Sequence, residues 1–296
     1  MNLTEMRGLR ESWIIAMEAS KTAPNTIEAY AGSLRLYLDW CESAGITEGL
    51  EQPEQVRRWF AHLAGLGRSA KTLNVRLSAL RVFAKWAMKE PFSGISESQM
   101  GRVEWAKGGD YIPDYITPGQ LGQLIAACAG TSFTAIRDAA LISLMYDSLL
   151  RADEVVSILA RGDIDLRRRS VRVRRGKGGK ERSSGFSPQT AQRLDRYQRA
   201  RAKHPHAAAD LYWLGKRGPL RYAGIYDIIT KRGRAAGMDI HPHVTRNGGA
   251  VDWKRRGGST EGLMAIGGWT SLEMVQHYTR AASIELALEE QQRLYE

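Results

Sequence analysis

Cysteine is scarce in this chain of 296 residues, which contains only Cys41 and Cys128. With so few cysteines, a disulfide framework is excluded, and a zinc site built from clustered cysteines is not expected. Both cysteines lie on apolar helical stripes, a setting typical of small buried side chains rather than of ligands or nucleophiles. The sequence therefore points away from redox chemistry and structural zinc.

Long hydrophobic runs are missing as well. No stretch approaches the roughly 18 uncharged apolar residues of a membrane-spanning helix. Glu5 and Glu11 interrupt the basic-then-apolar layout of a signal peptide. These absences predict an intracellular protein without a membrane partner. The chain is 43% hydrophobic and 25% charged, which excludes intrinsic disorder, and its length suggests about two domains.

Positive charge is abundant and unevenly distributed. Lys and Arg number 43 against 32 Asp and Glu, which gives a net charge of +11 and indicates a polyanionic partner. Residues 1–100 carry a net charge of +1, and residues 101–296 carry the remaining +10. The second half is therefore the basic half of the chain.

The densest positive charge lies in residues 167–182, RRRSVRVRRGKGGKER, which contain nine basic residues and one acidic residue, Glu181. A solvated charged face is one interpretation of such a run. The alternation of Val171 and Val173 with arginines instead predicts a half-buried strand with a cationic edge, followed by a glycine-rich hairpin turn. A cationic hairpin tip suits the phosphate backbone of a nucleic acid.

The first 90 residues predict four amphipathic helices, because apolar side chains recur at helical spacing in four successive stretches. Polar side chains suited to DNA phosphates open the second of these helices and line the fourth. They are Lys21, Thr22, Asn25 and Thr26, followed by Lys71, Thr72, Arg76 and Arg81. Ordinary capping and solvation is the alternative for any one of them taken alone.

Residues 91–116 lose the helical period and accumulate Pro and Gly, which predicts an interdomain linker. A second domain, residues 117–282, opens on Thr117-Pro118-Gly119-Gln120, the pattern of a capping box with proline at the first helical position. Helical patterns, the next from about 136 to 149, surround the cationic hairpin. We therefore expect a mainly α fold with one small antiparallel sheet, in which a four-helix domain (residues 1–90) precedes a mostly helical second domain.

Five short patterns follow one another in the second domain, and their order is more specific than any one of them. They are Arg151-Ala152-Asp153-Glu154, Gly176-Lys177-Gly178-Gly179-Lys180-Glu181-Arg182, His243-Val244-Thr245-Arg246, Gly267-Gly268-Trp269 and, nine residues beyond Trp269, Tyr278. Taken alone, the first could be a local ion pair, Trp269 a core residue and Tyr278 a packing residue.

This ordered set resembles the catalytic residues of the tyrosine recombinases, the phage integrase family. The N-terminal helices, with Asn25-Thr26 and Lys71-Thr72, resemble that family's core-binding domain, so the likeness covers nearly the whole chain. At Asn247 and Trp269 many relatives have histidine. Tryptophan is a known alternative at the second position, and Asn247 affects only a supporting contact.

The resemblance implies an enzyme that cuts and rejoins duplex DNA without metal, ATP or another cofactor. Such cleavage needs positive charge at the phosphorus, a nucleophile and a proton donor for the leaving 5' oxygen. Arg151 and Arg246 would clamp the scissile phosphate. Tyr278 would attack it to give a 3'-phosphotyrosine, and Lys177 would protonate the leaving oxygen.

Other residues of the set have supporting parts in this interpretation. His243 would hydrogen-bond the phosphate or assist proton movement. Trp269 would pack against the nucleophile while its indole N–H reaches an oxygen, and Glu154 would orient Arg151 or His243. DNA backbone contacts are expected from the hairpin residues Arg174, Arg175, Lys180 and Arg182.

Two other functions compete with recombination. A DNA-binding regulator could keep the fold without cutting, but the complete catalytic set argues against it. A type IB topoisomerase shares the chemistry, but the separate N-terminal helices and the tail argue against that function. Tyr222, Tyr226 and Tyr295 compete for the nucleophile role, and only Tyr278 has the spacing from Trp269.

The histidine pairs do not change this assignment. Neither His241 with His243 nor His204 with His206 is accompanied by a carboxylate or cysteine cluster at ligand spacing. We therefore expect no metal site.

The resemblance also implies partners. They are double-stranded DNA with core-type attachment sites and three further copies of the chain in a homo-tetramer, and a directionality factor is possible. Residues 283–296 form an amphipathic tail that would dock on a neighbouring protomer, with packing in cis as the alternative.

Because the core-binding helices begin almost at Met1, we expect no arm-binding domain. The stretch from Gly268 to Tyr278 resembles phage integrases more than chromosomal resolvases. It favours integration of phage or mobile-element DNA, in the cytoplasm and at the nucleoid of a bacterial host.

Overall fold

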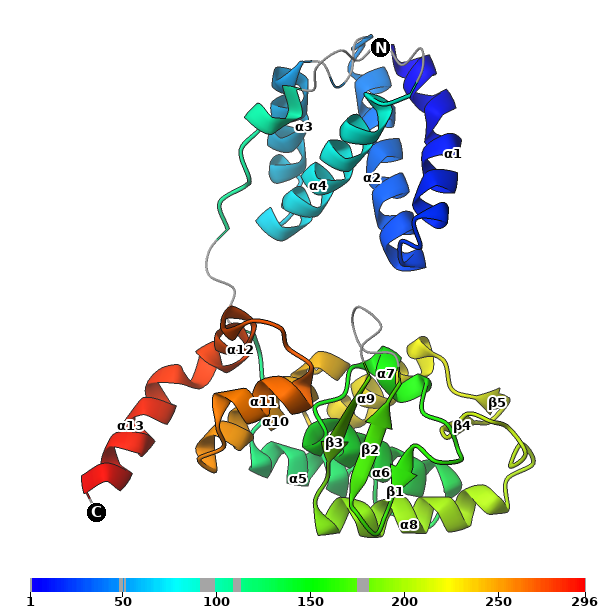
Figure 1. The fold of residues 1–296 in the computed structure, drawn as a ribbon, viewed down its shortest axis with the longest axis vertical. Helices are drawn as coiled ribbons and strands as arrows, with labels where there is room; N and C mark the ends of the chain where they lie inside the picture. Colours follow the sequence, from blue (N-terminus) through cyan, green and yellow to red (C-terminus); the bar gives the residue numbers. More distant parts are fainter. Residues whose placement is uncertain are drawn as a thin grey trace. The chain divides into compact units, whose positions relative to one another are not determined.

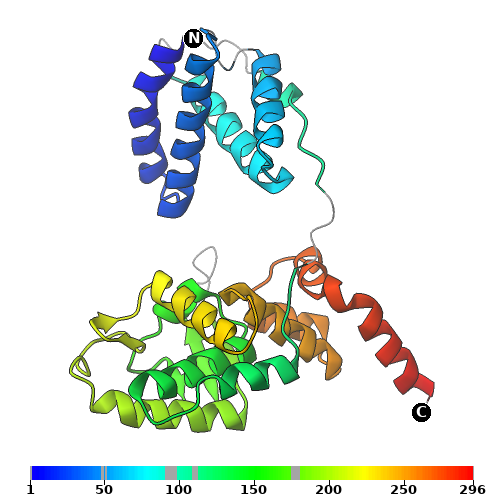
Figure 2. The same ribbon diagram turned by 180° about the vertical axis from the view of Figure 1, so that it is seen from behind.

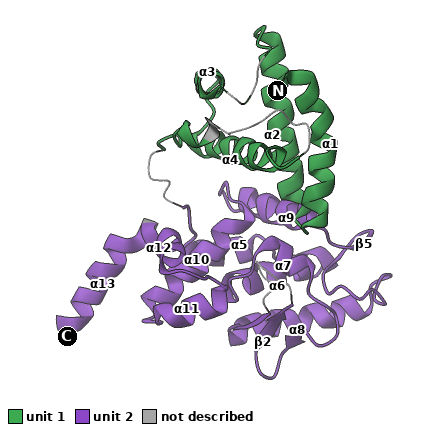
Figure 3. Cartoon of the chain, turned by 45° about the horizontal axis from the view of Figure 1, so that its top comes forward, with its two compact units in different colours: residues 1–111 green, residues 112–296 purple. Residues whose placement is uncertain are grey.

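The chain folds into two compact units, Met1–Tyr111 and Ile112–Glu296 (Figure 3). The structure, a computed structural model, describes residues 2–47, 50, 52–90, 99–108, 113–174 and 181–295. Most of these residues are helical, with a small antiparallel sheet, as the sequence predicts. None of the helices in these ranges is long and apolar enough to cross a membrane.

Unit 1, within its described residues, is a bundle of four helices followed by a short 3-10 helix (Figure 1). The elements are α1 (Leu3–Ala19), α2 (Pro24–Ser43), α3 (Pro53–Gly65), α4 (Ala70–Ala87) and η1 (Gln99–Arg102). Asn2 and Glu5 form a capping box at the start of α1, and the Ser69 side chain caps α4. Proline occupies the first turn of α2 and of α3. The expected helical N-terminal domain is confirmed.

Aromatic side chains dominate the core of unit 1. Trp13 packs edge-on against Phe83 with ring centroids 5.1 Å apart, and Tyr37 packs against Trp59 at the same distance. All four are almost fully buried, and so is Cys41, which confirms its interpretation as a core residue. Such pairs stabilise the bundle beyond the area that they bury.

The stretch 91–116, expected to be a linker, is partly built into the two units. Val103 is 1% exposed in the core of unit 1, and Ile116 is 2% exposed in the core of unit 2. Asn74 of α4 holds Ala106, because its Oδ1 accepts the Ala106 N–H at 2.8 Å and its Nδ2 donates to the Ala106 carbonyl at 3.1 Å. Val103 and Ile116 are isolated apolar residues that form no helical or strand pattern in the sequence. A prediction from composition alone therefore placed both of them in the linker.

Unit 2 contains the expected helices and hairpin. Its elements are α5 (Pro118–Ala126), α6 (Phe133–Asp147), α7 (Ala152–Val156), β1 (Ile164–Asp165), β2 (Ser170–Val173), β3 (Arg182–Gly185), α8 (Pro188–Ala202), β4 (Leu214–Gly215), β5 (Gly218–Pro219), α9 (Tyr222–Ala235), α10 (Pro242–Arg255), α11 (Thr260–Gly267), α12 (Leu272–Thr279), η3 (Arg280–Ala282) and α13 (Ser283–Tyr295). The capping box of Thr117 and Gln120 forms as predicted. Helix α6 begins earlier than expected because Ser132 caps it.

The sheet of unit 2 has the antiparallel order β1-β2-β3, in which Val171 pairs with Ser184 and Val173 with Arg182. Both valines are buried while Arg172 between them is exposed, which confirms the half-buried strand with a cationic edge. The expectation of a single sheet is wrong, because β4 and β5 form a second two-stranded ribbon. Strands of two residues are too short to show a period.

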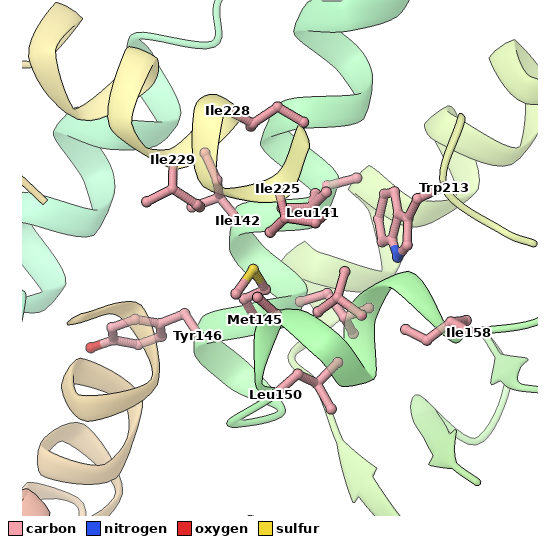
Figure 4. Packing of buried hydrophobic residues seen from close by; sticks show 14 of the residues in the cluster. Leu141, Ile142, Met145, Tyr146, Leu150, Ile158, Trp213, Ile225, Ile228 and Ile229 are labelled. Atoms are coloured by element: carbon pink, nitrogen blue, oxygen red, sulfur yellow. The ribbon is translucent and has the colours of Figure 1, made fainter. Parts of the chain in front are cut away.

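Helix α6 is central to the core of unit 2. Its Leu141, Ile142 and Met145 pack against isoleucines of α9 and against Trp213, as Figure 4 shows. Helix α8 runs alongside α6 in both views of the fold (Figures 1 and 2). Cys128 belongs to the same cluster, so its interpretation as a core residue is confirmed. This packing fixes the end of α6, from which the chain leads directly to Arg151.

A buried ion network joins α6 to α9. Asp138 is 4% exposed, and its Oδ1 accepts hydrogen bonds from Nε and Nη2 of Arg137 at 2.8 and 2.6 Å. Its Oδ2 accepts from Nε of Arg232 at 2.8 Å. The two guanidinium groups also donate to the Leu214 and Ala127 carbonyls. One carboxylate therefore balances two largely buried cations.

Asp138→Asn is expected to lower the free energy of unfolding by about 3 kcal/mol, because it leaves two buried guanidinium groups without a counter-charge. Urea unfolding would measure the change. Asp195→Asn, which removes the carboxylate of an exposed pair with Arg199, is the matched control and should change stability by less than about 0.5 kcal/mol. Equal stability of the two variants would contradict the prediction.

Candidate active site

Helix α10 supplies Arg246, which is completely buried. Its Nη1 donates to the Leu149 carbonyl, and its Nη2 donates to the Gly267 carbonyl at 2.6 Å. Leu149 has a φ of +53°, a conformation that is uncommon for a residue other than glycine. The guanidinium is thus held by backbone on two sides, from the turn after α6 and from the end of α11.

Two glycines let α10 approach its neighbours closely. A Cβ on Gly249 would lie 2.1 Å from the Tyr146 carbonyl oxygen, and one on Gly248 would lie 2.4 Å from that of Ile116. Asn247, where many relatives have histidine, donates from Nδ2 to the Asp114 carbonyl at 2.7 Å. Asn247 therefore fastens the segment before α5 to α10.

Arg151 is the N-terminal flanking residue of α7 and lies beside Glu154. Oε2 of Glu154 accepts the Arg151 backbone N–H at 2.8 Å, and Oε1 accepts Nη1 of the Arg151 side chain at 3.0 Å. Glu154 therefore orients Arg151, one of its two expected roles.

Arg182 also binds Glu154, which differs from its expected contact with DNA. Nη1 and Nη2 of Arg182 donate to Oε1 and Oε2 of Glu154 at 2.7 and 2.8 Å, and Nε donates to the Ile266 carbonyl at 2.9 Å. Its side chain is 9% exposed. Nε, Nη1 and Nη2 of Arg182 all donate hydrogen bonds inside the protein, where the sequence predicted a contact with the DNA backbone.

Glu154 is buried, with 3% of the residue exposed. Burial alone would raise its pKa, but the hydrogen bonds and charges of Arg182 and then Arg151 outweigh burial, and the pKa lies below its ordinary value. Two arginines therefore share one charged carboxylate.

Tyr278, on α12, meets His243 and Trp269. Its hydroxyl lies 3.1 Å from Nε2 of His243, and its ring centroid lies 4.9 Å from that of Trp269. His243 and Arg246 are three residues apart on α10 and so share one face. Five of the six expected catalytic residues are described, and Tyr278, His243, Trp269 and Arg246 meet directly.

Trp269 is placed by the end of α11. Gly268 terminates that helix with a φ of +64°, a conformation that glycine adopts without strain. The Trp269 ring then lies against Arg246, whose Cζ is 4.4 Å from the ring centroid. The expected packing of Trp269 against Tyr278 is present.

Electrostatics favour an anion at this point. Burial, and then the like charge of Arg151, lower the pKa of Arg246. Nε of Arg246 and Nε1 of Trp269 are buried donors without an acceptor in the described part of the chain. A phosphate would supply both the negative charge and the oxygen acceptors that these groups lack.

Some predicted residues lie elsewhere. Arg175, Lys177 and Lys180 are outside the described residues. Arg174, the residue that follows β2, pairs with the buried Asp163 at 2.7 Å, and its side chain is 41% exposed. Within the described ranges no three His, Cys, Asp or Glu side chains are placed to hold a metal ion.

The expected DNA contacts of unit 1 divide into two kinds. The residues near the starts of α2 and α4 keep surface positions: Lys21, Thr22, Asn25, Thr26, Lys71 and Thr72. Arg81 instead donates to the Val103 carbonyl at 2.6 Å and stacks over Trp105. Arg76 lies over Trp59, with Nε buried. These two arginines therefore serve packing, which differs from the expectation.

Sequence reasoning missed the backbone acceptors of the site, the carbonyls of Leu149, Ile266 and Gly267. Carbonyl groups occur at every residue, so no sequence signal marks them. Only the approach of Arg182 and Arg246 identifies them.

Comparison with known proteins decides the family. The model of the phage integrase family matches residues 114–284, and the model of the phage integrase N-terminal SAM-like domain matches residues 11–91. The chain belongs to the phage integrase family. It is a tyrosine recombinase, an enzyme class that cleaves and rejoins DNA.

Relatives of this integrase-family chain cover most of its length. It is 31% identical to tyrosine recombinase XerD of Ralstonia nicotianae over 270 residues, which are 88% of this chain and 85% of the relative. It is 30% identical to tyrosine recombinase XerC of Bacillus subtilis, over 87% and 86%.

Solved structures of integrases and Xer recombinases share the fold. The Tn1549 transposon integrase in complex with transposon right end DNA has a TM-score of 0.74 at 14% identity, covering 100% of both chains. The XerH recombinase bound to difH in a post-cleavage complex has a TM-score of 0.71 at 17% identity, covering 94% of this chain and 82% of that chain.

Proposed function

We propose that this tyrosine recombinase acts site-specifically on duplex DNA through a 3'-phosphotyrosine at Tyr278. The observation that carries the proposal is the 3.1 Å contact between the Tyr278 hydroxyl and Nε2 of His243, beside the buried Arg246. A nucleophile, a proton acceptor and a fixed cation thus lie within one group of contacts.

The reaction follows from these groups. The Tyr278 oxygen forms a bond to phosphorus as the bond from phosphorus to the 5' oxygen breaks, and His243 accepts the phenolic proton. Arg151 and Arg246 stabilise the charge that develops on the non-bridging oxygens. Lys177 donates a proton to the leaving 5' oxygen. Rejoining reverses these steps with a 5' hydroxyl as the nucleophile, and the energy kept in the phosphotyrosine makes ATP unnecessary.

A nicked suicide duplex carrying a candidate core site tests the proposal. After cleavage the short fragment beyond the nick diffuses away, so rejoining is prevented and the covalent adduct accumulates. The protein is incubated with this duplex in EDTA, and the product is resolved on a denaturing gel and mapped by peptide mass spectrometry. We expect a covalent adduct on the peptide that contains Tyr278. DNA binding without any adduct would instead identify a catalytically silent regulator of the same fold.

Two biological roles use this chemistry. The sequence from Gly268 to Tyr278 supports integration of phage or mobile-element DNA, while relatives of the Xer type support resolution of chromosome dimers equally well. Recombination assays with each substrate class separate the roles. Activity of the purified protein in both directions would argue against a directionality factor.

For DNA binding we propose core-type sites contacted by the surface residues at the starts of α2 and α4 and by the hairpin. The residues are Lys21, Thr22, Asn25, Thr26, Lys71, Thr72, Arg174, Arg175 and Lys180. Helix N-termini and basic side chains favour phosphate oxygens there.

Helix α13 supports assembly on DNA as a homo-tetramer. It points away from the other helices of unit 2 (Figures 1 and 2), and Ile284, Leu288 and Leu294 are 78%, 54% and 79% exposed. Arg255 of α10 forms ion pairs with Glu285 and Glu289 in the first half of α13. An apolar face presented in this way suits a neighbouring protomer.

Deletion from Ser283 onward is expected to abolish the tetramer on DNA and to reduce strand exchange by at least about tenfold, because it removes that apolar contact area. Native gels of the synaptic complex and recombination assays would measure this, with single-site DNA binding as the control. Full strand exchange with tetrameric synapsis after the deletion would contradict the proposal.

A further inference from the structure

Arg182 joins three separate parts of the site. It is the first residue of β3, and its side chain is 9% exposed. Its two Nη atoms bind both oxygens of Glu154, and its Nε binds the Ile266 carbonyl. Because the planar guanidinium group of Arg182 donates hydrogen bonds from all three of its nitrogens, it fixes the relative positions of β3, α7 and the end of α11.

The first connection leads to Arg151 through Glu154. Oε1 of Glu154 accepts from Arg182 at 2.7 Å and from the Arg151 side chain at 3.0 Å, while Oε2 accepts from Arg182 at 2.8 Å and from the Arg151 backbone at 2.8 Å. Arg182 is therefore the main counter-ion of this carboxylate. Without it, the whole charge of Glu154 would fall on Arg151, and less of the Arg151 charge would act on a phosphate.

The second connection leads to Trp269. Arg182 holds the Ile266 carbonyl, and Arg246 holds the next carbonyl, that of Gly267. A Cβ on Gly268 would lie 3.2 Å from Cδ of Arg182, so the arginine packs directly under the turn before Trp269. The two arginines thus set the turn that places Trp269 against Tyr278.

We propose that Arg182 is a positioning residue for DNA cleavage: it neutralises Glu154, so that the charge of Arg151 remains available to the scissile phosphate. This inference rests on the proposed function. Arg182 itself touches no reacting atom, and its contribution passes through the charge that Arg151 exerts. A substrate without that charge would need Arg182 much less.

A methylphosphonate at the scissile position makes that comparison, because a methyl group replaces one non-bridging oxygen and removes the negative charge. Adduct formation is measured in single turnover on phosphate and methylphosphonate suicide duplexes. For Arg182→Met we expect the rate to fall about 10²-fold on phosphate and less than about fivefold on methylphosphonate. Affinity for DNA should change by less than about threefold.

Two further variants keep the test decisive. The double variant Arg182→Met with Glu154→Gln removes the carboxylate charge together with its counter-ion, so no unpaired anion is left buried. We expect this variant to cleave the phosphate duplex at least about fivefold faster than Arg182→Met alone. Arg172→Met is the matched control, since Arg172 pairs with Glu181 on the exposed side of the same hairpin, and it should stay within about twofold of the unmodified protein.

Equal losses of Arg182→Met on the two substrates would overturn the inference, because a purely structural defect does not depend on substrate charge. Unchanged cleavage of phosphate by that variant would overturn it as well. If the unmodified protein forms no adduct on either substrate, the proposed function itself fails, a result distinct from any difference between variants.

Discussion

Tyr278→Phe is expected to abolish the covalent protein–DNA adduct, with a rate at least about 10⁴-fold below that of the unmodified protein. Phenylalanine keeps the ring that lies 4.9 Å from Trp269 but has no oxygen to bond to phosphorus. Because the substitution removes one hydrogen bond, to His243, folding and DNA affinity should change little. Adduct yield on the suicide duplex and a DNA-binding isotherm measure the two quantities.

The matched control is Tyr226→Phe, which removes a hydroxyl from another partly exposed tyrosine of unit 2. Tyr226 is 44% exposed on α9, and its loss should leave adduct formation unchanged. An adduct formed by Tyr278→Phe and mapped to Tyr226 would show that the nucleophile has been misassigned.

Arg246→Met is expected to slow cleavage by roughly 10³-fold or more, about 4 kcal/mol of transition-state stabilisation. Arg246 is completely buried, and its Nε has no acceptor among the described residues, so its loss removes a fixed cation and a donor suited to a phosphate oxygen. Arg246→Lys keeps the positive charge but lacks the planar guanidinium group, so we expect it to recover only part of the cleavage rate.

Single-turnover adduct formation measures this effect, and thermal unfolding monitors the cost of leaving the Leu149 and Gly267 carbonyls without their donor. Arg256→Met is the matched control, because Arg256 follows α10 directly and its side chain is 73% exposed in a pair with Asp252. Cleavage by Arg246→Met within about tenfold of the unmodified protein would exclude Arg246 as the main phosphate clamp.

Local patterns in the sequence predicted local structure well. The capping box of Thr117 and Gln120 and the alternation of Val171 with Val173 each involve residues a few positions apart. Hydrogen bonds and burial over such short spans depend little on the rest of the chain. The four helices of unit 1, the hairpin strands and most helices of unit 2 were predictable for this reason.

The candidate site was predictable as a set of residues but not as a set of contacts. The order from Arg151 to Tyr278 indicated the catalytic group, and the meeting of Tyr278 with His243 and Trp269 agrees with it. Arg81 and Arg182 were expected to contact DNA, yet both bind groups of the protein. A long basic side chain looks the same in sequence whether it faces solvent or a buried carboxylate.

The sequence alone determined the family and the helical architecture and indicated the candidate catalytic residues, because these depend on periodicity, capping and the order of motifs. Tertiary structure decided which partner each charge takes. Arg182 bonds to Glu154, 28 residues away in the sequence, and to Ile266, 84 residues away. No local sequence pattern predicts contacts between residues so far apart in the chain. Packing of α7, β3 and α11 brings these groups together, and burial makes their pairing obligatory, since an unpaired charge there would be too costly.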